Sequence, residues 1–335
     1  MLLQACGSST EAAPDCKSAD VFCVGMVTDF GKIDDKSLNQ SVWTGIESAR
    51  QAMGITAEYI LTTDSKDYDK NISTFGESGY DVIVTVGYSL RDATARSAVI
   101  YPEAIFIGVD QDHTPKDVDP TSPKNLVGLV FLEDQAGFKA GALAAQMSTS
   151  QKIGAVCSSD IVASIWRYCE GFKAGALYIN PGIDLNVVYH NDTSLDQAFI
   201  DPDWGAAMAK KMVEGGVDVL FGAGGETGNG AISAAAKEGI YVLGCDDDQF
   251  YLLPEARKWL LSSAVKLITP GVFDLIKSAK IGEFPGGTNY TGLTDLAPFH
   301  AFAKRIPDEV KNWMGVIDKG LLDGSIQTNV EPTKP

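Results

Sequence analysis

Two polar side chains follow the first apolar run of the sequence and are suited to bind a ligand. Residues 24–28 form that run, which leads directly into a polar loop that contains Asp29 and continues to Asn39. A loop between a strand and a helix N-terminus presents backbone N–H groups and side-chain acceptors to a cleft. A carboxylate accepts hydrogen bonds from ring N–H groups and an amide can pair with two atoms, so both fit the edge of a purine base. Ser37 and Gln40 have capping-box spacing and are expected to start the helix.

Two further aspartates end a pair of similar strands. Residues 105–110 and 241–246 each consist of an apolar strand, a glycine, one more residue and an aspartate. Ligands of open α/β sheets lie at the carboxyl ends of the strands, which makes Asp110 and Asp246 candidates for a cleft. An aspartate at such a position can equally cap the next helix or turn, and spacing alone does not decide between the two.

An enzyme is the main alternative class. The glycine-rich segment 222–230 follows a strand, and Asp246 comes about twenty residues later, as in dinucleotide-binding folds. The spacing is not G-x-G-x-x-G, however, because Thr227 occupies the third-glycine position. The aspartates at 246–248 and 34–35 lack the spacing of an EF-hand, and the three histidines have no nearby nucleophile. We therefore expect no catalytic residues, no cofactor and no metal.

The elements that would position these residues alternate between strands and helices. Short apolar runs separated by helical patterns predict parallel βαβ units with right-handed crossovers. One such series begins near residue 21 and a second one after about residue 132. Two consecutive doubly wound sheets in one chain predict an α/β fold of two Rossmann-like lobes with a cleft between them.

Charge and cysteine content exclude several classes. The net charge of −17 argues against binding nucleic acid through its phosphates, and no run approaches the ~20 apolar residues of a membrane span. The six cysteines contain no C-x-x-C pair, so a structural zinc site is not expected. Cys157 and Cys169 could pair in an oxidising compartment or stay reduced, whereas Cys23 and Cys245 are expected to be small core residues.

Residues 27–43, VTDFGKIDDKSLNQSVW, resemble the opening motif of the BMP (basic membrane protein) family. These are type I periplasmic-binding proteins, and they include purine-nucleoside receptors. The ordered set of matches covers essentially residues 21–300 and is specific to the family, though not to one ligand. The other matching segments are 86–88 with 92–93, 108–111, 136–145, 170–174, 199–202, 224–230, 244–249 and 262–266.

The resemblance implies a set of ligand-binding residues. It implies a purine base between two aromatic rings, of which one is Phe199, while Leu38 occupies the position of the other. Tyr88, Trp204 or Trp166 could supply a replacement ring, and core packing is the alternative for each of them. The full implied set is Asp29, Leu38, Asn39, Tyr88, Asp110, Phe199, Gly224, Gly225, Asp246 and Lys266.

The implied roles are chemically coherent. Asp29 and Asn39 look like ligands of the base edge, and Asp110 and Asp246 look like acceptors for ribose hydroxyls, to which a carboxylate can make charge-assisted hydrogen bonds. Lys266 looks like the cationic partner that reaches the sugar. The glycines at 224 and 225 are expected to let the backbone approach the sugar closely.

We also predict the lobe boundaries. Residues 1–19 are assigned to a leader or tether, 20–131 plus 246–281 to the N-terminal lobe, 132–245 plus 282–325 to the C-terminal lobe, and 326–335 to a tail. A three-crossing hinge of type I periplasmic-binding architecture is expected, with crossings near Leu132, near Gly244–Cys245 and near Ile281–Gly282.

The N-terminal residues bear on localisation. Residues 3–6, LQAC, resemble a bacterial lipobox, so Cys6 is expected to carry a lipid; a polar leader with an unrelated cysteine is the alternative. The whole pattern predicts a monomeric, extracytoplasmic substrate-binding lipoprotein of an ABC importer, anchored to the membrane by that lipid and partnered by an ABC permease. Its ligand would be a purine nucleoside or a related polar molecule. A nucleobase, a sugar, or ligand sensing on the same fold remain alternatives.

Overall fold

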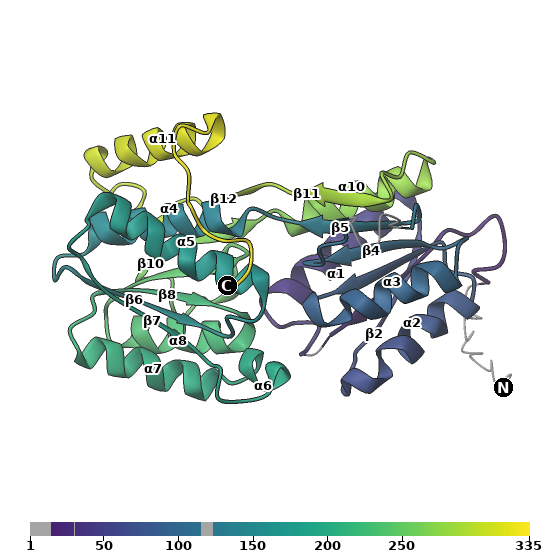
Figure 1. Cartoon of the computed structure of the whole chain (residues 1–335), viewed down its shortest axis with the longest axis horizontal. Helices are drawn as coiled ribbons and strands as arrows, with labels where there is room; N and C mark the ends of the chain where they lie inside the picture. Colours follow the sequence, from purple (N-terminus) through teal and green to yellow (C-terminus); the bar gives the residue numbers. More distant parts are fainter. Residues whose placement is uncertain (1–14, 30, 115–122) are drawn as a thin grey trace, which may run out of the picture.

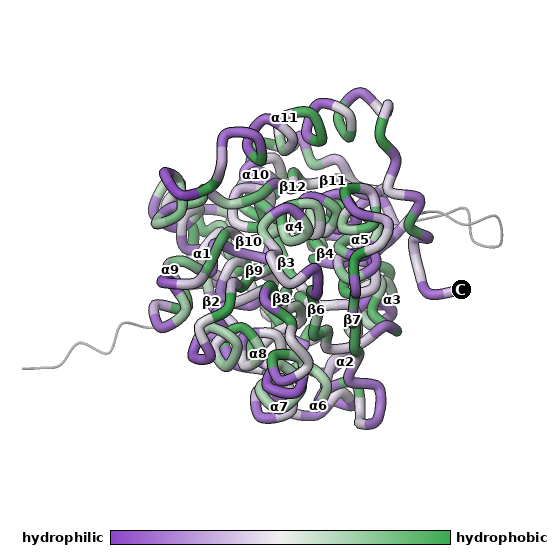
Figure 2. The backbone as a smooth tube through the Cα atoms, turned by 90° about the vertical axis from the view of Figure 1, so that its left-hand side faces the viewer, coloured by the Kyte–Doolittle hydropathy of each residue, from purple (hydrophilic) through white to green (hydrophobic). Residues whose placement is uncertain are grey.

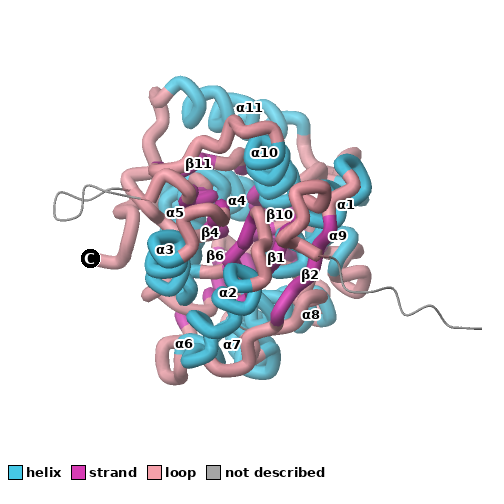
Figure 3. Tube along the Cα trace, turned by 90° about the vertical axis from the view of Figure 1, so that its right-hand side faces the viewer, coloured by secondary structure: helices cyan, strands magenta, loops and turns pink. Residues whose placement is uncertain are grey.

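The chain folds into two α/β lobes that lie side by side in the computed structural model (Figure 1). The structure describes residues 15–29, 31–114 and 123–335. Each lobe is built on a six-stranded sheet, and Figure 3 shows helices surrounding the central strands. The prediction of two doubly wound lobes is therefore confirmed.

The N-terminal lobe has a parallel sheet in the order β11-β5-β4-β3-β1-β2. Alternate residues of each strand point to opposite faces. Thus Val24 and Met26 pack against α1 and α10, whereas Cys23 and Val27 pack against α2 and α3. The elements are β1 (Cys23–Thr28), α1 (Leu38–Met53), β2 (Thr56–Ile60), α2 (Tyr68–Glu77), β3 (Val82–Val86), α3 (Arg91–Ile100), β4 (Ile105–Val109), β5 (Leu126–Val130), α10 (Ile268–Lys280) and β11 (Thr288–Thr291).

The C-terminal lobe repeats this plan with the sheet order β12-β10-β9-β8-β6-β7, in which only β12 is antiparallel among the described strands. Helices α4 and α5 cover one face, and α7 and α8 cover the other. The elements are α4 (Glu133–Met147), β6 (Lys152–Cys157), α5 (Ala163–Ile179), β7 (Asp184–Tyr189), α6 (Leu195–Phe199), α7 (Pro202–Glu214), β8 (Val219–Ala223), α8 (Gly225–Lys237), β9 (Tyr241–Asp246), α9 (Gln249–Leu252), β10 (Leu260–Lys266), β12 (Thr294–Leu296) and α11 (Asp308–Asp323).

Helix α11 forms an outer layer over α4 (Figures 1 and 2). Its buried residues Val310, Met314, Ile317 and Leu321 recur at the spacing of one helical face. They join the core cluster that also contains α4 and α5. The C-terminal lobe therefore has one more helical layer than the two faces of its sheet require.

Within the described residues, the chain crosses between the lobes at 131–132, at Leu267 and at 292–293. The first crossing lies where it was expected, but the other two predicted positions, Gly244–Cys245 and Ile281–Gly282, are wrong. β10 pairs with β9 in the C-terminal sheet, and β11 pairs with β5 in the N-terminal sheet. Residues 246–266 therefore belong to the C-terminal lobe, and 282–291 to the N-terminal lobe, contrary to the predicted boundaries.

The hinge crossings are bonded to one another. The Leu267 N–H donates to the Leu293 carbonyl at 2.9 Å, and Thr294 Oγ1 donates to the Leu132 carbonyl at 3.4 Å. All three crossings therefore lie close together and connect the lobes as one unit.

Two disulfides join cysteines in the described residues. Cys157, at the end of β6, is bonded to Cys169 in α5, which is the pairing considered from the sequence. Cys23 is fully buried in the core, as expected, and is bonded to Cys16, a pairing that was not considered from the sequence. Cys245 is a buried free thiol, as expected. Cys6 lies outside the described residues. No helix in the described part of the chain is long and apolar enough to cross a bilayer.

Candidate ligand-binding site

A pocket lies between the lobes; the empty space in it is about 670 Å³, a figure that includes space open to solvent. The sheet order of both lobes reverses direction between the first and third strands, β1/β3 and β6/β8, and ligands bind at such switch points. Asp29 follows β1, and residues 87–89 follow β3; across the pocket, residues 162–165 follow β6, and residues 225–226 follow β8. Both lobes therefore direct their switch points into one cleft.

The structure brings together all but one of the predicted site residues. Those that line the pocket are Asp29, Leu38, Asn39, Tyr88, Asp110, Phe199, Gly225, Asp246 and Lys266. Gly224 is not among the lining residues. A Cβ at this position would lie 1.9 Å from Ser158 Oγ, so glycine allows the chain after β8 to pass Ser158. Its predicted approach to the ligand stays a prediction. Gly87 likewise leaves room for Asp29, because a Cβ added at Gly87 would lie 1.9 Å from Asp29 Oδ2.

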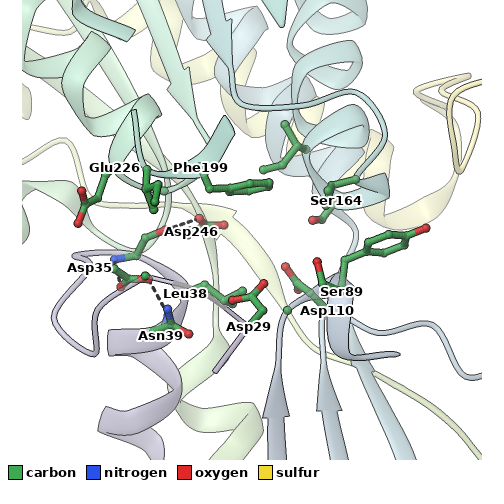
Figure 4. Close-up of a pocket in the computed structure, with 18 of the residues that line it drawn as sticks. Asp29, Asp35, Leu38, Asn39, Ser89, Asp110, Ser164, Phe199, Glu226 and Asp246 are labelled. Carbon is green, nitrogen blue, oxygen red and sulfur yellow. Dashed lines mark hydrogen bonds between the residues drawn. The ribbon is translucent and has the colours of Figure 1, made fainter. Parts of the chain in front are cut away.

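The pocket has one aromatic and one aliphatic wall. Figure 4 shows Phe199 on the C-terminal side, across the pocket from Leu38 and Asp29 of the N-terminal lobe. Of the possible replacement rings, Trp204 stacks on His190 and Trp166 stacks on Tyr189, and neither lines the pocket. Tyr88 does line it, with 40% of its surface exposed.

Ser37 is the N-cap residue of α1, as predicted, but its side chain makes no capping bond, and Asp35 caps the helix instead. The Asp35 carboxylate accepts hydrogen bonds from the backbone N–H groups of Ser37, Asn39 and Gln40 at 2.9–3.1 Å. A left-handed backbone at Lys36, with φ of 56°, precedes the helix. Burial raises the pKa of Asp35 to about 6, against the lowering effect of these hydrogen bonds. Asp35 also lines the pocket.

The Ser37 side chain, which makes no capping bond, connects the two lobes. Its hydroxyl donates to Asp246 Oδ2 at 2.7 Å, and the Ser41 hydroxyl donates to Asp247 Oδ2 at the same distance. Gln249 Nε2 donates to the Lys36 carbonyl at 3.2 Å. The described conformation is therefore closed, with the N-terminus of α1 bonded directly to the C-terminal lobe.

A buried charge cluster occupies the hinge side of the pocket. Lys266 Nζ lies 2.6 Å from Asp110 Oδ2, 3.2 Å from Asp246 Oδ1 and 3.8 Å from Glu133 Oε1. Burial acts to lower the pKa of Lys266, but Asp110 and Asp246 outweigh it and hold this pKa above its ordinary value. Arg167 pairs with Glu133 at 2.6 Å. Lys266 thus neutralises carboxylates from both lobes at once.

Two oxygens of this cluster lack hydrogen-bond donors. Asp110 Oδ1 and Asp246 Oδ1 are buried and make no hydrogen bond within the described structure, although Lys266 is near the latter. A buried acceptor without a donor costs about 1–3 kcal/mol, and more when it is charged. Since both carboxylates line the pocket, a ligand that supplies two hydroxyl donors would satisfy them.

The structure adds pocket residues that sequence reasoning did not identify: Asp35, Ser37 as an interlobe donor, Ser89, Val162, Ser164, Ile165, Ile200 and Glu226. Glu133 and Arg167 complete the charge cluster from behind. Glu133 comes directly after the predicted crossing at Leu132. This position next to the hinge is the one sequence feature that could have indicated that Glu133 lies near the site. Nothing in the sequence pairs it with Arg167.

Other described carboxylates near the cleft are engaged in contacts within the protein. Among the described residues, no group of three or more potential ligands is placed to hold a metal ion. Asp247 accepts from Ser41, and Asp248 lies 2.6 Å from His300 Nε2. These acidic side chains serve interlobe and intralobe contacts.

Comparison with known proteins identifies the family. Residues 22–295 match the family described as ABC transporter substrate-binding protein, PnrA-like. The chain belongs to this family. The family and the similar proteins are substrate-binding proteins rather than enzymes, as the sequence led us to expect.

Several relatives of this family member span nearly its whole length. A CD4+ T-cell-stimulating antigen from Listeria innocua is 32% identical and covers 100% of this chain and 95% of its own length. An ABC transporter nucleoside-binding protein BmpA from Lactococcus lactis subsp. cremoris is 29% identical over 96% of this chain and 91% of its own. The crystal structure of an ABC transporter solute-binding protein from Aeropyrum pernix K1 has a TM-score of 0.78 at 21% identity, covering 91% of this chain and 92% of that chain, which supports the fold.

Proposed function

We propose that this substrate-binding protein takes up a purine nucleoside, or a closely related polar ligand with vicinal hydroxyls, between its lobes. The observation that carries the proposal is the pair of buried oxygens, Asp110 Oδ1 and Asp246 Oδ1, that accept no hydrogen bond in the described structure, although the second lies 3.2 Å from Lys266 Nζ. A ribose offers two neighbouring hydroxyls, each of which would donate a charge-assisted hydrogen bond. The BmpA relative, named as nucleoside-binding, supports the same ligand class.

The remaining walls suit a flat, polar ring. Phe199 would cover one face of a base and Leu38 the other, and Asp29 and Asn39 would meet its edge. A carboxylate and an amide together offer both acceptors and a donor to such an edge. A sugar alone has no flat aromatic ring to lie against Phe199, and a free base has no vicinal hydroxyls to donate to the two carboxylates.

The direct test is mass spectrometry of ligand released from the purified protein, followed by calorimetry with the compound that is found. We expect a nucleoside, and we expect Asp110→Asn and Asp246→Asn each to weaken its binding about 10- to 100-fold, the loss of one hydrogen bond to a charged group. Asp184→Asn, an exposed carboxylate beside Lys152, is the matched control and should bind like wild type. A sugar without any purine among the released compounds would contradict the ligand assignment.

Leu38 offers a gain-of-affinity test. Leu38→Phe would give the base a second aromatic face, and aromatic pairs contribute about 0.5–1.5 kcal/mol beyond area burial. We expect affinity for a purine nucleoside to rise about two- to tenfold, with no gain for a sugar. Leu38→Met is the matched control, because it keeps the bulk without the ring. Equal affinity of all three proteins for the nucleoside would mean that Leu38 does not contact the base.

We further propose that the protein works outside the cytoplasm as a monomeric lipoprotein of an ABC importer. Membership of the family supports a permease partner, and the two disulfides are typical of proteins from an oxidising compartment. Lipidation of Cys6 would anchor the protein to the membrane beside that permease. Metabolic labelling with a fatty acid, compared between wild type and Cys6→Ser in the native gene, tests the anchor.

A further inference from the structure

Two hydroxyls at the start of α1 face two consecutive carboxylates of the other lobe. Ser37 and Ser41 are four residues apart, so they lie on one side of the helix, about one turn from each other. Asp246 is the last residue of β9, and Asp247 follows it directly. The Ser37 hydroxyl donates to Asp246 Oδ2 and the Ser41 hydroxyl donates to Asp247 Oδ2, each at 2.7 Å. Two hydroxyl-to-carboxylate bonds therefore connect the lobes here.

These two bonds differ in their relation to the pocket. Ser37 and Asp246 line it, whereas Ser41 and Asp247 are not among its lining residues. A substitution at Ser37 or Asp246 would change ligand contacts and the contact between the lobes together. The bond between Ser41 and Asp247 can be removed without altering the lining of the pocket, so its effect on a ligand can be measured by itself.

Both partners of the outer bond are fixed within their own lobes. Ser41 is 2% exposed, and the Thr269 hydroxyl of α10 donates to its carbonyl at 2.8 Å. Asp247 Oδ1 accepts from the Asp248 N–H at 2.6 Å, which orients the carboxylate. A carboxylate only accepts hydrogen bonds, and hydrogen bonds with a charged partner are stronger than neutral ones. The bond therefore joins two groups that are already placed for it.

A third contact lies beside this bond. Gln249 is 1% exposed, and its N–H donates to Ser263 Oγ at 3.1 Å within the C-terminal lobe. Its Nε2 donates to the Cys245 carbonyl of the same lobe and to the Lys36 carbonyl of the other, both at 3.2 Å. Gln249 is not a lining residue either. The loop after β9 therefore meets the start of α1 at two points outside the pocket.

We propose that the bond between Ser41 and Asp247, together with that between Gln249 and Lys36, is a latch that holds the lobes closed and sets how long a ligand stays bound. The bonds join different lobes, so they favour the closed state in addition to what the ligand contributes. They have to break before the ligand leaves. Ser41 and Asp247 are thus positioning residues that act through closure. The proposal takes its ligand, but not its geometry, from the proposed function.

The latch is of moderate strength. When the lobes separate, Asp247 is hydrated, and the Ser41 hydroxyl keeps a second acceptor, the Ser37 carbonyl at 2.9 Å. The net contribution of a hydrogen bond is the difference between these states. We therefore expect Ser41→Ala to speed ligand dissociation about five- to thirtyfold and not to slow association.

The test measures both rates with a radiolabelled purine nucleoside (adenosine, guanosine or inosine, whichever wild type binds most tightly) and an unlabelled chase. Ser48→Ala is the matched control, because it removes the same group from the same helix, where it donates only to the Thr44 carbonyl at 2.8 Å. This control should release the nucleoside like wild type. Unchanged dissociation in Ser41→Ala, or slower association with unchanged dissociation, would overturn the proposal.

A double-mutant cycle separates the latch from a general structural effect. Asp247→Ala should also speed dissociation, and it removes the contact with the Asp248 N–H as well. The cycle cancels that second loss, because it compares Ser41→Ala with and without the carboxylate. In the Asp247→Ala background, Ser41→Ala should change the dissociation rate less than about twofold. Effects of the two substitutions that simply multiply would show that the residues do not act on closure as a pair.

Failure of the proposed function would look different. If wild type binds none of the three nucleosides, the ligand assignment fails. The same variants are then compared with the compound that mass spectrometry finds in the purified protein. Faster release of that compound from Ser41→Ala than from Ser48→Ala would support the latch, and equal release would refute it.

Discussion

Replacing Lys266 with methionine is expected to abolish ligand binding and to lower the free energy of unfolding by about 3–5 kcal/mol. The substitution leaves Asp110, Asp246 and Glu133 buried together with only Arg167 as a cation. Methionine keeps most of the volume, so the loss reports on charge and not on a cavity. Urea unfolding at neutral pH measures the stability, and calorimetry measures the binding.

The free energy of unfolding should depend on pH differently in wild type and in the variant. In wild type the pKa of Lys266 is raised, so its stabilising contribution is complete at neutral pH and is lost only as the pH rises above the ordinary lysine range. Burial already raises the pKa of Glu133, and the variant removes the opposing effect of Lys266, so the variant should regain stability as the pH falls toward about 5. Lys139→Met, which removes a lysine paired with the half-exposed Asp295 and Asp318, is the control and should cost less. A Lys266→Met protein as stable as wild type at neutral pH would contradict the role of the cluster.

A nucleoside 5′-monophosphate is expected to bind at least about a hundredfold more weakly than its parent nucleoside, because like charges brought together in a desolvated site cost several kcal/mol. The acidic residues that line the pocket are Asp29, Asp35, Asp110, Glu226 and Asp246, and Lys266 is the only cation among its lining residues. Lys266 is already engaged by Asp110 and Asp246. A phosphate would therefore meet carboxylates and no free cation of the pocket.

Competition calorimetry with the two compounds measures this difference. A neutral 5′-substituted nucleoside of similar size separates the effect of charge from that of bulk, and it should bind better than the monophosphate. Higher salt should reduce the difference between the two for the more exposed carboxylates, since it screens them. Equal affinity for the nucleoside and its monophosphate would mean that the carboxylates do not control ligand selection.

The parts of the site that could be predicted are those that follow from strand ends. Asp29, Asp110 and Asp246 come directly after or at the end of apolar runs, and the topology of a doubly wound sheet brings such positions to one edge. Phe199 and Lys266 needed the family resemblance, because neither lies in a pattern that points to a cleft. The two-lobed fold followed from the alternation of elements alone.

The parts that could not be predicted depend on contacts between distant segments. β10 was not identified as a strand because Ser262 and Ser263 interrupt its apolar run. Both serines are buried: Ser262 donates to the Ala297 carbonyl, and Ser263 accepts from the Gln249 N–H. Because this strand was not predicted, the second crossing was expected near residue 245, whereas it lies at residue 267. Similarly, Ser37 occupies the N-cap position that its spacing predicted, but its hydroxyl makes no capping bond, and Asp35 accepts the hydrogen bonds of the first turn instead.

The bond between Leu267 and Leu293 limits how the lobes can separate. It joins two of the crossings as neighbouring strands, so one cannot slide along the other without breaking it. Translation of the lobes is thereby restrained, while rotation about the line of the crossings leaves the bond intact. We expect a single rotational degree of freedom, in which Lys266 at the axis moves little and Ser37 and Ser41 swing away from Asp246 and Asp247. Access for a ligand would then come from the edge remote from that axis.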